Sequence, residues 1–97
     1  MTGAAGYIGA TAIARLLEAG HTVVGLDCLR FGGSALLGSY LTGRFTLARG
    51  DIRDRGLIAR VLEGADAVVH LAGIVGDPAC AAEPELARAV NLDATRR

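Results

Sequence analysis

Three glycines at a constant spacing form the strongest chemical motif of the sequence. Residues 2–9 read T-G-A-A-G-Y-I-G and place Gly3, Gly6 and Gly9 three residues apart, directly before a helical pattern of apolar residues. Glycine allows a positive φ and a close approach of the backbone to a ligand, and free N–H groups at a helix N-terminus attract anions. The motif therefore predicts a pyrophosphate-binding loop, although a glycine triplet alone is as typical of ordinary turns.

An acidic residue lies close to the offset that such a loop requires. Asp27 ends the apolar run T-V-V-G-L-D and follows Gly9 by 18 residues. A carboxylate about 20 residues beyond the glycines accepts hydrogen bonds from the adenosine ribose in dinucleotide-binding folds. The alternative is a solvated aspartate at a strand end. Arg30 could accept the 2′-phosphate of NADP, but Asp27 would repel that phosphate, so NAD is the favoured cofactor and NADP the alternative.

Alternating strand-like and helix-like blocks must position these residues. The pattern predicts strands over 22–27, 45–48 and 65–72, helices over 7–19, 53–62 and 84–97, a short helical turn within 34–41 and a loop through 77–78. Gly20 follows the first helix as a C-terminal cap, and Ile8, Ile13, Leu16 and Leu17 form its expected apolar face. This alternation is typical of an α/β fold in which helices cross over between parallel strands.

Composition limits the classes of protein to which the chain could belong. Its 97 residues allow one domain, and 52% hydrophobic residues with a mean hydropathy of +0.40 indicate a globular protein. Ten basic and ten acidic residues give zero net charge, so we expect no nucleic-acid or membrane partner. Cys28 and Cys80 suit neither a disulfide framework nor a zinc site. We therefore expect a cytoplasmic protein without a metal.

Four motifs follow one another along the chain. They are the glycine run at 2–9, G-L-D at 25–27, G-D-I-R-D at 50–54 and H-L-A-G at 70–73. In this order and spacing they resemble the extended short-chain dehydrogenase/reductase family, the NAD-dependent sugar-nucleotide epimerases and dehydratases. The resemblance implies a Rossmann-type, doubly wound parallel sheet with strand order 3-2-1-4, and residues 1–97 would be part of one NAD(P)-binding domain.

The resemblance also implies which residues contact the cofactor. Gly3, Gly6, Tyr7, Ile8 and Gly9 would surround the pyrophosphate, Asp27 would hold the ribose, Asp51 and Ile52 would contact adenine, and Leu71, Ala72 and Gly73 would line the cofactor after the fourth strand. Asn91 matches an asparagine of the family's next helix. Asp51 could equally cap the helix that follows it. We expect His70 to be a core or hydrogen-bonding residue rather than a catalytic one.

The chain departs from the family pattern at both ends. Only Met1 stands before the glycine loop, where the family has its first, central strand, so the second and fourth strands should lie about 10 Å apart with nothing bonded between them. We therefore expect a fragment of low stability or a misassigned start. The family's catalytic Y-x-x-x-K pair is also missing, because the sequence contains no lysine and Tyr40 with Arg44 lies too early in the fold.

We therefore interpret the sequence as the dinucleotide-binding N-terminal portion of an NAD-dependent sugar-nucleotide epimerase or dehydratase. The stretch itself would have no catalytic residue, whereas the full-length protein would be an enzyme and a homodimer that binds a sugar nucleotide. The alternatives are a reductase or hydroxysteroid-type dehydrogenase of the same family and a non-catalytic dinucleotide-binding module. A binder of coenzyme A or of a mononucleotide is a further alternative, in which Asp27 would have no role.

Overall fold

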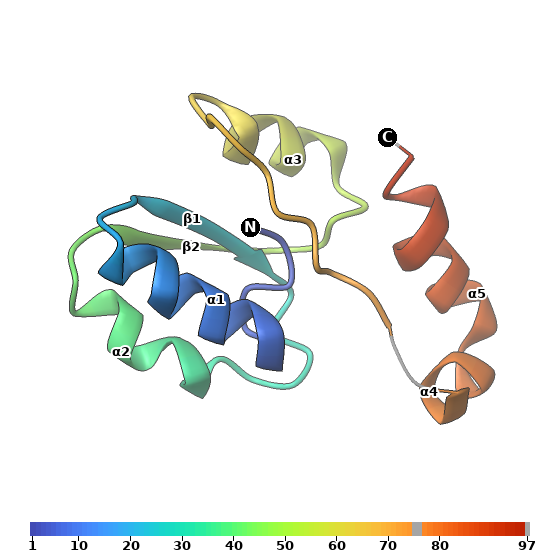
Figure 1. The fold of residues 1–97 in the computed structure, drawn as a ribbon. Helices are drawn as coiled ribbons and strands as arrows, with labels where there is room; N and C mark the ends of the chain where they lie inside the picture. Colours follow the sequence, from blue (N-terminus) through green and yellow to red (C-terminus); the bar gives the residue numbers. More distant parts are fainter. Residues whose placement is uncertain (75–76, 97) are drawn as a thin grey trace.

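The computed structural model describes residues 1–74 and 77–96 and has an α/β architecture. Its elements are α1 (Tyr7–Glu18), β1 (Val23–Asp27), the 3-10 turn η1 (Ser34–Leu36), α2 (Leu37–Tyr40), β2 (Phe45–Arg49), α3 (Arg55–Leu62), α4 (Asp77–Ala82), α5 (Pro84–Arg88) and the π-helical turn η2 (Ala89–Asp93). Figure 1 shows α1 and α2 on one side of the two strands and α3 on the other, with α4 and α5 beside this unit. The predicted fold class is confirmed.

The two strands pair in parallel, as the alternation of blocks predicts. Val23 lies opposite Phe45, and the register continues without a break to Asp27 opposite Arg49. The backbone N–H of Gly50 donates to the carbonyl of Asp27 at 3.0 Å and so extends the pairing beyond β2. This pairing brings the ends of both strands to the same edge of the sheet, where Asp27 and the motif at 50–54 lie next to each other.

Helix α1 ends with the cap that its sequence predicts. Gly20 has a φ of +94°, its N–H donates to Leu17 O, and the N–H of His21 donates to Leu16 O, both at 3.1 Å. This is the Schellman arrangement, in which the left-handed residue is most often glycine because a Cβ atom is disfavoured there. Arg44 adds a further donor at this end, 2.5 Å from Leu17 O.

The core lies between α1, α2 and the inner face of the strands. Its buried apolar side chains include Ile13, Leu17, Val23, Leu36 and Phe45. The prediction that Ile8 belongs to this core is wrong, because its side chain is 67% exposed. At about 100° per residue, Ile8 lies about 140° around the helix from Ile13, outside the buried stripe.

Residues 65–72 do not form the predicted strand. The structure pairs this segment only at His70, through an isolated parallel bridge to Thr2. A strand needs a partner along its length, and Met1 and Thr2 are the residues that the chain offers at this position. The expectation that nothing bonds between the two segments is also wrong, because Thr2 bridges Leu26 on one side and His70 on the other.

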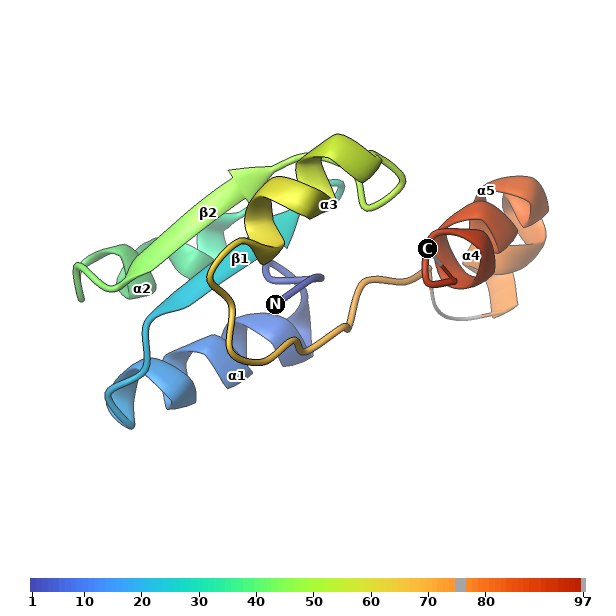
Figure 2. The same cartoon turned by 90° about the horizontal axis from the view of Figure 1, so that it is seen from above.

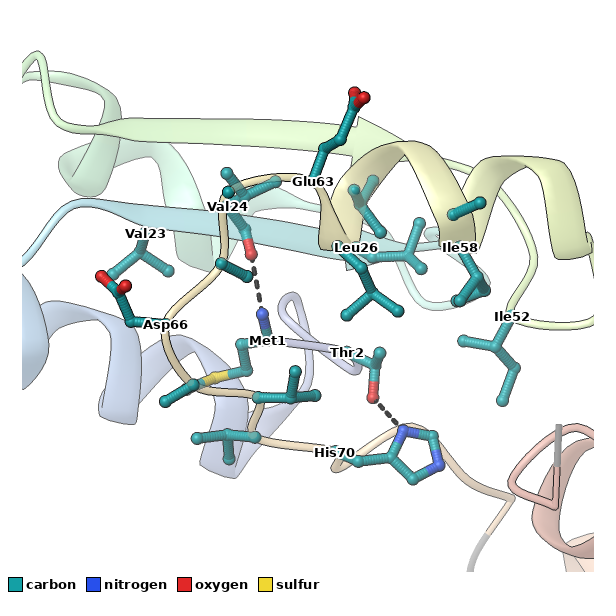
Figure 3. A pocket seen from close by; sticks show the side chains of 18 of the residues that line it. Met1, Thr2, Val23, Val24, Leu26, Ile52, Ile58, Glu63, Asp66 and His70 are labelled. Atoms are coloured by element: carbon teal, nitrogen blue, oxygen red, sulfur yellow. Dashed lines mark hydrogen bonds between the residues drawn. The ribbon is translucent and has the colours of Figure 1, made fainter.

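Beyond Met1 the same position is a cleft of about 1060 Å³ between β1, α3 and the 65–70 segment. Figure 3 shows Val24 and Leu26 on one wall and Ile58 on another, with the N-terminal amine of Met1 donating to Val24 O at 2.7 Å. Burial lowers the pKa of this amine, because desolvation disfavours its charged form. The N-terminus therefore lies in a mostly apolar cleft next to β1.

Three predicted boundaries are corrected by the structure. Helix α3 starts at Arg55, two residues later than expected, because Asp54 caps it by accepting the N–H of Leu57 at 3.0 Å. The loop expected through 77–78 is instead the start of α4. The single helix expected over 84–97 begins with Pro84 as its first residue but gives way to the π-helical turn η2, and residue 97 lies outside the described residues.

Candidate functional site

The glycine loop turns sharply and leads directly into the start of α1, which no described side chain caps. Gly3 has a φ of +68°, and the N–H of Gly6 donates to Gly3 O at 3.2 Å. Gly6 is the N-cap of α1, and among the described residues no side chain caps this end and no acidic residue lies in its first turn. The N–H groups of this turn are therefore available to an anion, which the helix dipole also favours.

Two of the three glycines are required by close packing. A Cβ atom on Gly9 would lie 2.0 Å from Gly3 O, so at this position the first turn of α1 packs directly on the backbone of the loop that precedes it. A Cβ atom on Gly3 would lie 2.8 Å from the backbone of Leu71 and of Ala72. The loop is thus held against the predicted cofactor-lining segment at 71–73.

The side chains next to Gly6 point outwards. Tyr7 is 93% exposed and Ile8 is also exposed, which leaves both free to flank a ligand at the helix start. A shallow hollow of about 500 Å³ runs beside them along α1, where Ala10 and Ala35 contribute to its lining. The larger cleft described above lies on the other side of Met1 and Thr2 and is separate from this surface.

Asp27 is connected directly to the glycine loop. Its Oδ2 accepts the N–H of Ala5 at 3.0 Å, and its Oδ1 accepts the N–H of Leu29 at 2.7 Å. The first bond fixes the distance between the loop and the carboxylate, and the second turns the chain back after β1, where Leu29 has a φ of +60°. The predicted ribose carboxylate and the predicted pyrophosphate loop thus belong to one site.

Asp51 and Ile52 follow β2 at the edge of the sheet where Asp27 lies. The Asp51 carboxylate is paired with an arginine, whereas the Ile52 side chain is buried. Both carboxylate oxygens of Asp51 accept from the guanidinium of Arg53, at 2.5 Å to Nη2, and Oδ1 also accepts the backbone N–H of Arg53. These hydrogen bonds lower the pKa of Asp51, and the same pair raises the pKa of Arg53. The prediction that Asp51 caps α3 is wrong, because Asp54 does so. The Ile52 side chain is buried and lines the cleft.

Thr2 is a site residue that the sequence did not reveal. Its buried Oγ1 accepts the N–H groups of Leu71 and Ala72, both at 3.1 Å, and contacts His70 Nδ1 at 2.6 Å (Figure 3). The bonds hold the 71–73 segment against the loop. A threonine before a glycine run carries no recognisable signal in sequence, because its hydroxyl gains these partners only when the glycine loop and the 71–73 segment meet in the fold.

The hydrogen bonds around His70 define its tautomer. Thr95 Oγ1 donates to Asn91 O at 3.2 Å and therefore accepts at its 3.0 Å contact with His70 Nε2, which must carry the proton. Nδ1 is then free to accept the Thr2 hydroxyl proton. The expectation of a hydrogen-bonding histidine is confirmed, whereas its placement in the core is wrong because the residue is exposed.

Asn91 holds the end of the same segment from η2. Its Oδ1 accepts the N–H of Ile74 at 2.7 Å and its Nδ2 donates to Ile74 O at 2.8 Å, which imitates the pairing of a neighbouring strand. A Cβ atom on Gly73 would lie 3.1 Å from Asn91 Oδ1, so a larger residue would crowd this clamp. Asn91 is thus structurally engaged, which the sequence left open.

Tyr40 and Arg44 have structural contacts in the described part of the chain. Tyr40 packs edge-on against Phe45 with ring centroids 5.2 Å apart, while Arg44 donates to the end of α1. In residues 1–74 and 77–96 no helix has the length and apolar character that a membrane crossing demands.

A glycine turn, an uncapped helix start and a carboxylate at the end of the adjacent parallel strand define the Rossmann type of α/β fold. The profile of the family described as "NAD dependent epimerase/dehydratase family" matches residues 1–97 in full. The chain therefore belongs to this family.

Curated relatives agree with the match. A UDP-glucose 4-epimerase of Mycolicibacterium smegmatis is 37% identical over 99 residues, which cover the whole chain and 32% of that protein. A UDP-glucose 4-epimerase of Neisseria meningitidis serogroup B is 36% identical over 89 residues, covering 87% of the chain and 26% of the relative. The chain thus spans between a quarter and a third of the length of these relatives.

Solved structures place the same fold in the same family. A UDP-glucose-4-epimerase from Stenotrophomonas maltophila, determined with NAD and formylated UDP-arabinopyranose, superimposes with a TM-score of 0.85 at 30% identity, over 97% of this chain and 30% of that one. DesIV, a dTDP-glucose 4,6-dehydratase from Streptomyces venezuelae determined with NAD, gives a TM-score of 0.85 at 35% identity, over 97% and 32%. The predicted family and Rossmann fold are confirmed.

Proposed function

We propose that residues 1–97 form the dinucleotide-binding portion of an NAD-dependent sugar-nucleotide epimerase or dehydratase. The observation that carries the proposal is the 3.0 Å bond between Ala5 N and Asp27 Oδ2, because it joins a pyrophosphate loop to a ribose carboxylate in one rigid unit. The NAD in the similar epimerase and dehydratase structures supports the choice of cofactor.

The residues present fit a dinucleotide. The uncapped start of α1 offers N–H groups to a pyrophosphate, and Gly3 has the positive φ that the tight turn needs. We assign the following contacts: Gly3, Gly6, Tyr7, Ile8 and Gly9 to the pyrophosphate, Asp27 to the ribose, Asp51 and Ile52 to adenine, and Leu71, Ala72 and Gly73 to the far end of the cofactor. Arg53 already binds the Asp51 carboxylate, so we expect adenine to be recognised mainly through backbone groups here.

The mechanism of these residues is binding and orientation. A bound nicotinamide would supply the hydride acceptor, and residues of this chain would hold the dinucleotide. Asp27 would accept hydrogen bonds from the ribose hydroxyls while it retains the loop through Ala5, and Thr2 fixes the 71–73 segment on which the distal part of the cofactor would lie. We assign no catalytic residue to this stretch, because the sequence contains no lysine to accompany a catalytic tyrosine.

The full-length protein is proposed to act on a sugar nucleotide in the cytoplasm, as a homodimer. The UDP-glucose 4-epimerase and dTDP-glucose 4,6-dehydratase relatives support the substrate class, and the family resemblance supports the homodimer. A reductase of the same family and a non-catalytic dinucleotide-binding module remain the alternatives. A tyrosine with a lysine four residues later, encoded within about 100 residues downstream of Arg97, favours an enzyme.

A titration with NAD and NADH tests the proposal. We expect Asp27→Ala to weaken NAD binding by about tenfold or more, since a charge-assisted hydrogen bond to the ribose contributes about 1.5–3 kcal/mol. Asp66→Ala, at an exposed carboxylate outside the proposed site, is the matched control and should leave affinity unchanged. If Asp27→Ala binds NAD as well as the unaltered chain does, Asp27 has no role in binding, as a coenzyme A or mononucleotide binder would predict, and the proposal fails.

A further inference from the structure

Arg30 lies in the turn that follows the Asp27 carboxylate. Asp27 Oδ1 accepts the N–H of Leu29 at 2.7 Å, and the N–H of Gly32 donates to Leu29 O at 3.0 Å. These two bonds fix the backbone on both sides of Arg30. The Arg30 side chain therefore starts from a fixed turn three residues beyond Asp27, and an arginine near this position of a dinucleotide site can bind a ribose 2′-phosphate.

A carboxylate from a distant segment already holds this cation. Arg30 Nη2 donates to Glu83 Oε2, and the two residues are 53 positions apart in sequence. Glu83 precedes Pro84 at the junction of α4 and α5, so the pair connects the turn after β1 to the last helices. The Arg30 guanidinium also lies over the ring of Phe31, with 5.7 Å from Cζ to the ring centroid. Arg30 is thus engaged by both a carboxylate and an aromatic face.

We infer that Glu83 is a specificity-determining residue that selects NAD over NADP by keeping Arg30 occupied. The inference rests on the proposed dinucleotide function and goes beyond it, because it assigns cofactor choice to a residue outside the four motifs. A 2′-phosphate placed beside Asp27 would meet two carboxylates and a guanidinium that is already neutralised. The free 2′-hydroxyl of NAD carries no charge and avoids both penalties.

The pair is suited to a binding test because it contributes little to folding. The side chains of Arg30 and Glu83 remain 39% and 45% exposed, and pairs of this kind have little effect on stability. Arg49 lies opposite Asp27 in the strand register and is a further cation whose contribution must be separated. Glu85, two residues beyond Glu83 in the first turn of α5, provides a matched acidic control.

The experiment titrates NAD and NADP into the full chain and its variants at low and moderate salt. We expect Glu83→Gln to bind NADP about five- to tenfold more tightly, with NAD affinity changed less than about twofold, since a released guanidinium gains a charge-assisted, partly screened bond to phosphate. The gain should disappear in Glu83→Gln/Arg30→Gln and persist in Glu83→Gln/Arg49→Gln. Glu85→Gln should leave the NADP to NAD ratio unchanged.

Two results would overturn the inference while leaving the proposed function intact. One is an unchanged NADP to NAD ratio in Glu83→Gln, and the other is a gain that survives the loss of Arg30. If the unaltered chain binds neither dinucleotide, the proposed function fails first and this inference fails with it.

Discussion

The carbonyl oxygen of Gly3 occupies the space that a side chain on Gly9 would need, 2.0 Å from the position of its Cβ atom. The first turn of α1 therefore rests on the loop that precedes it. Because both contacting groups belong to the backbone, the site cannot relax by moving a flexible side chain. A change in the conformation of the glycine turn would consequently also displace the first turn of α1.

We expect Gly9→Ala to destabilise the chain by about 1–3 kcal/mol, the typical cost of overpacking, and to weaken dinucleotide binding. Gly38→Ala is the control, since a Cβ atom there would meet no described atom within 4 Å and alanine favours a helix. Urea unfolding followed by circular dichroism measures both variants. Equal midpoints for the two would contradict the packing that the structure gives.

Thr2→Val should loosen the 71–73 segment. Valine keeps the shape of threonine but removes the Oγ1 that accepts the N–H of Ala72, and it leaves Leu71 N–H only its longer bond to the Thr2 carbonyl at 3.3 Å. The loss of an acceptor for a partly buried donor costs about 1–3 kcal/mol. Amide hydrogen exchange should show faster exchange at these two positions. Thr11→Val, on the exposed side of α1, should change stability by less than about 0.5 kcal/mol. Unchanged protection at Leu71 and Ala72 would show that the Thr2 hydroxyl does not hold this segment.

The Asp51 to Arg53 pair should make a small, pH-dependent contribution to stability. The pKa of Asp51 is lowered in the folded chain, so the stabilisation is complete above the unfolded pKa of about 3.9 and is lost as pH falls through the folded value. Since the pair is exposed, we expect less than about 1 kcal/mol. Asp51→Asn should therefore be less stable at pH 6 and match the unaltered chain near pH 2. A deficit that persists at low pH would exclude the charge as its cause.

Extending the chain upstream of Met1 by about ten strand-forming apolar residues should raise the melting temperature. Such a segment would fill the cleft between β1 and residues 65–70 and would replace the partly buried amine with a peptide bond. A gain of 1 kcal/mol corresponds to about 4–8 °C for a domain of this size. A Gly/Ser extension of equal length controls for chain length. If the unextended chain melts as high and as cooperatively, the cleft is not a strand position.

Local patterns predicted the elements that depend on local physics. The helix at 7–19, the strands around Val23 and Phe45 and the placement of Asp27 at a strand end all follow from periodicity and from turn chemistry. The strand at 65–72 was wrongly predicted because a β-strand is a property of its partners as well as of its own residues. Apolar composition alone could not show that pairing would be limited to His70.

The candidate site could likewise be predicted only in part from the sequence. Glycine spacing identifies the loop, since a positive φ favours glycine, and the structure joins it to Asp27. Thr2 and Glu83 were missed because each acts on a segment more than 50 residues away, through bonds that no short motif encodes. Asp51 and Asp54 both suit a helix cap in sequence, and only the observed start of α3 distinguishes them.

Thr2 also determines the spacing between the two segments that it bridges. It is the one residue of the described chain that bridges both Leu26 and His70, so a single extended residue separates β1 from the segment at 70–73. A slip of one position in this register would turn the Thr2 side chain to the opposite face and shift the two walls along each other. The separation between the end of β1, where Asp27 lies, and the segment at 71–73 therefore depends on the position of Thr2 between them.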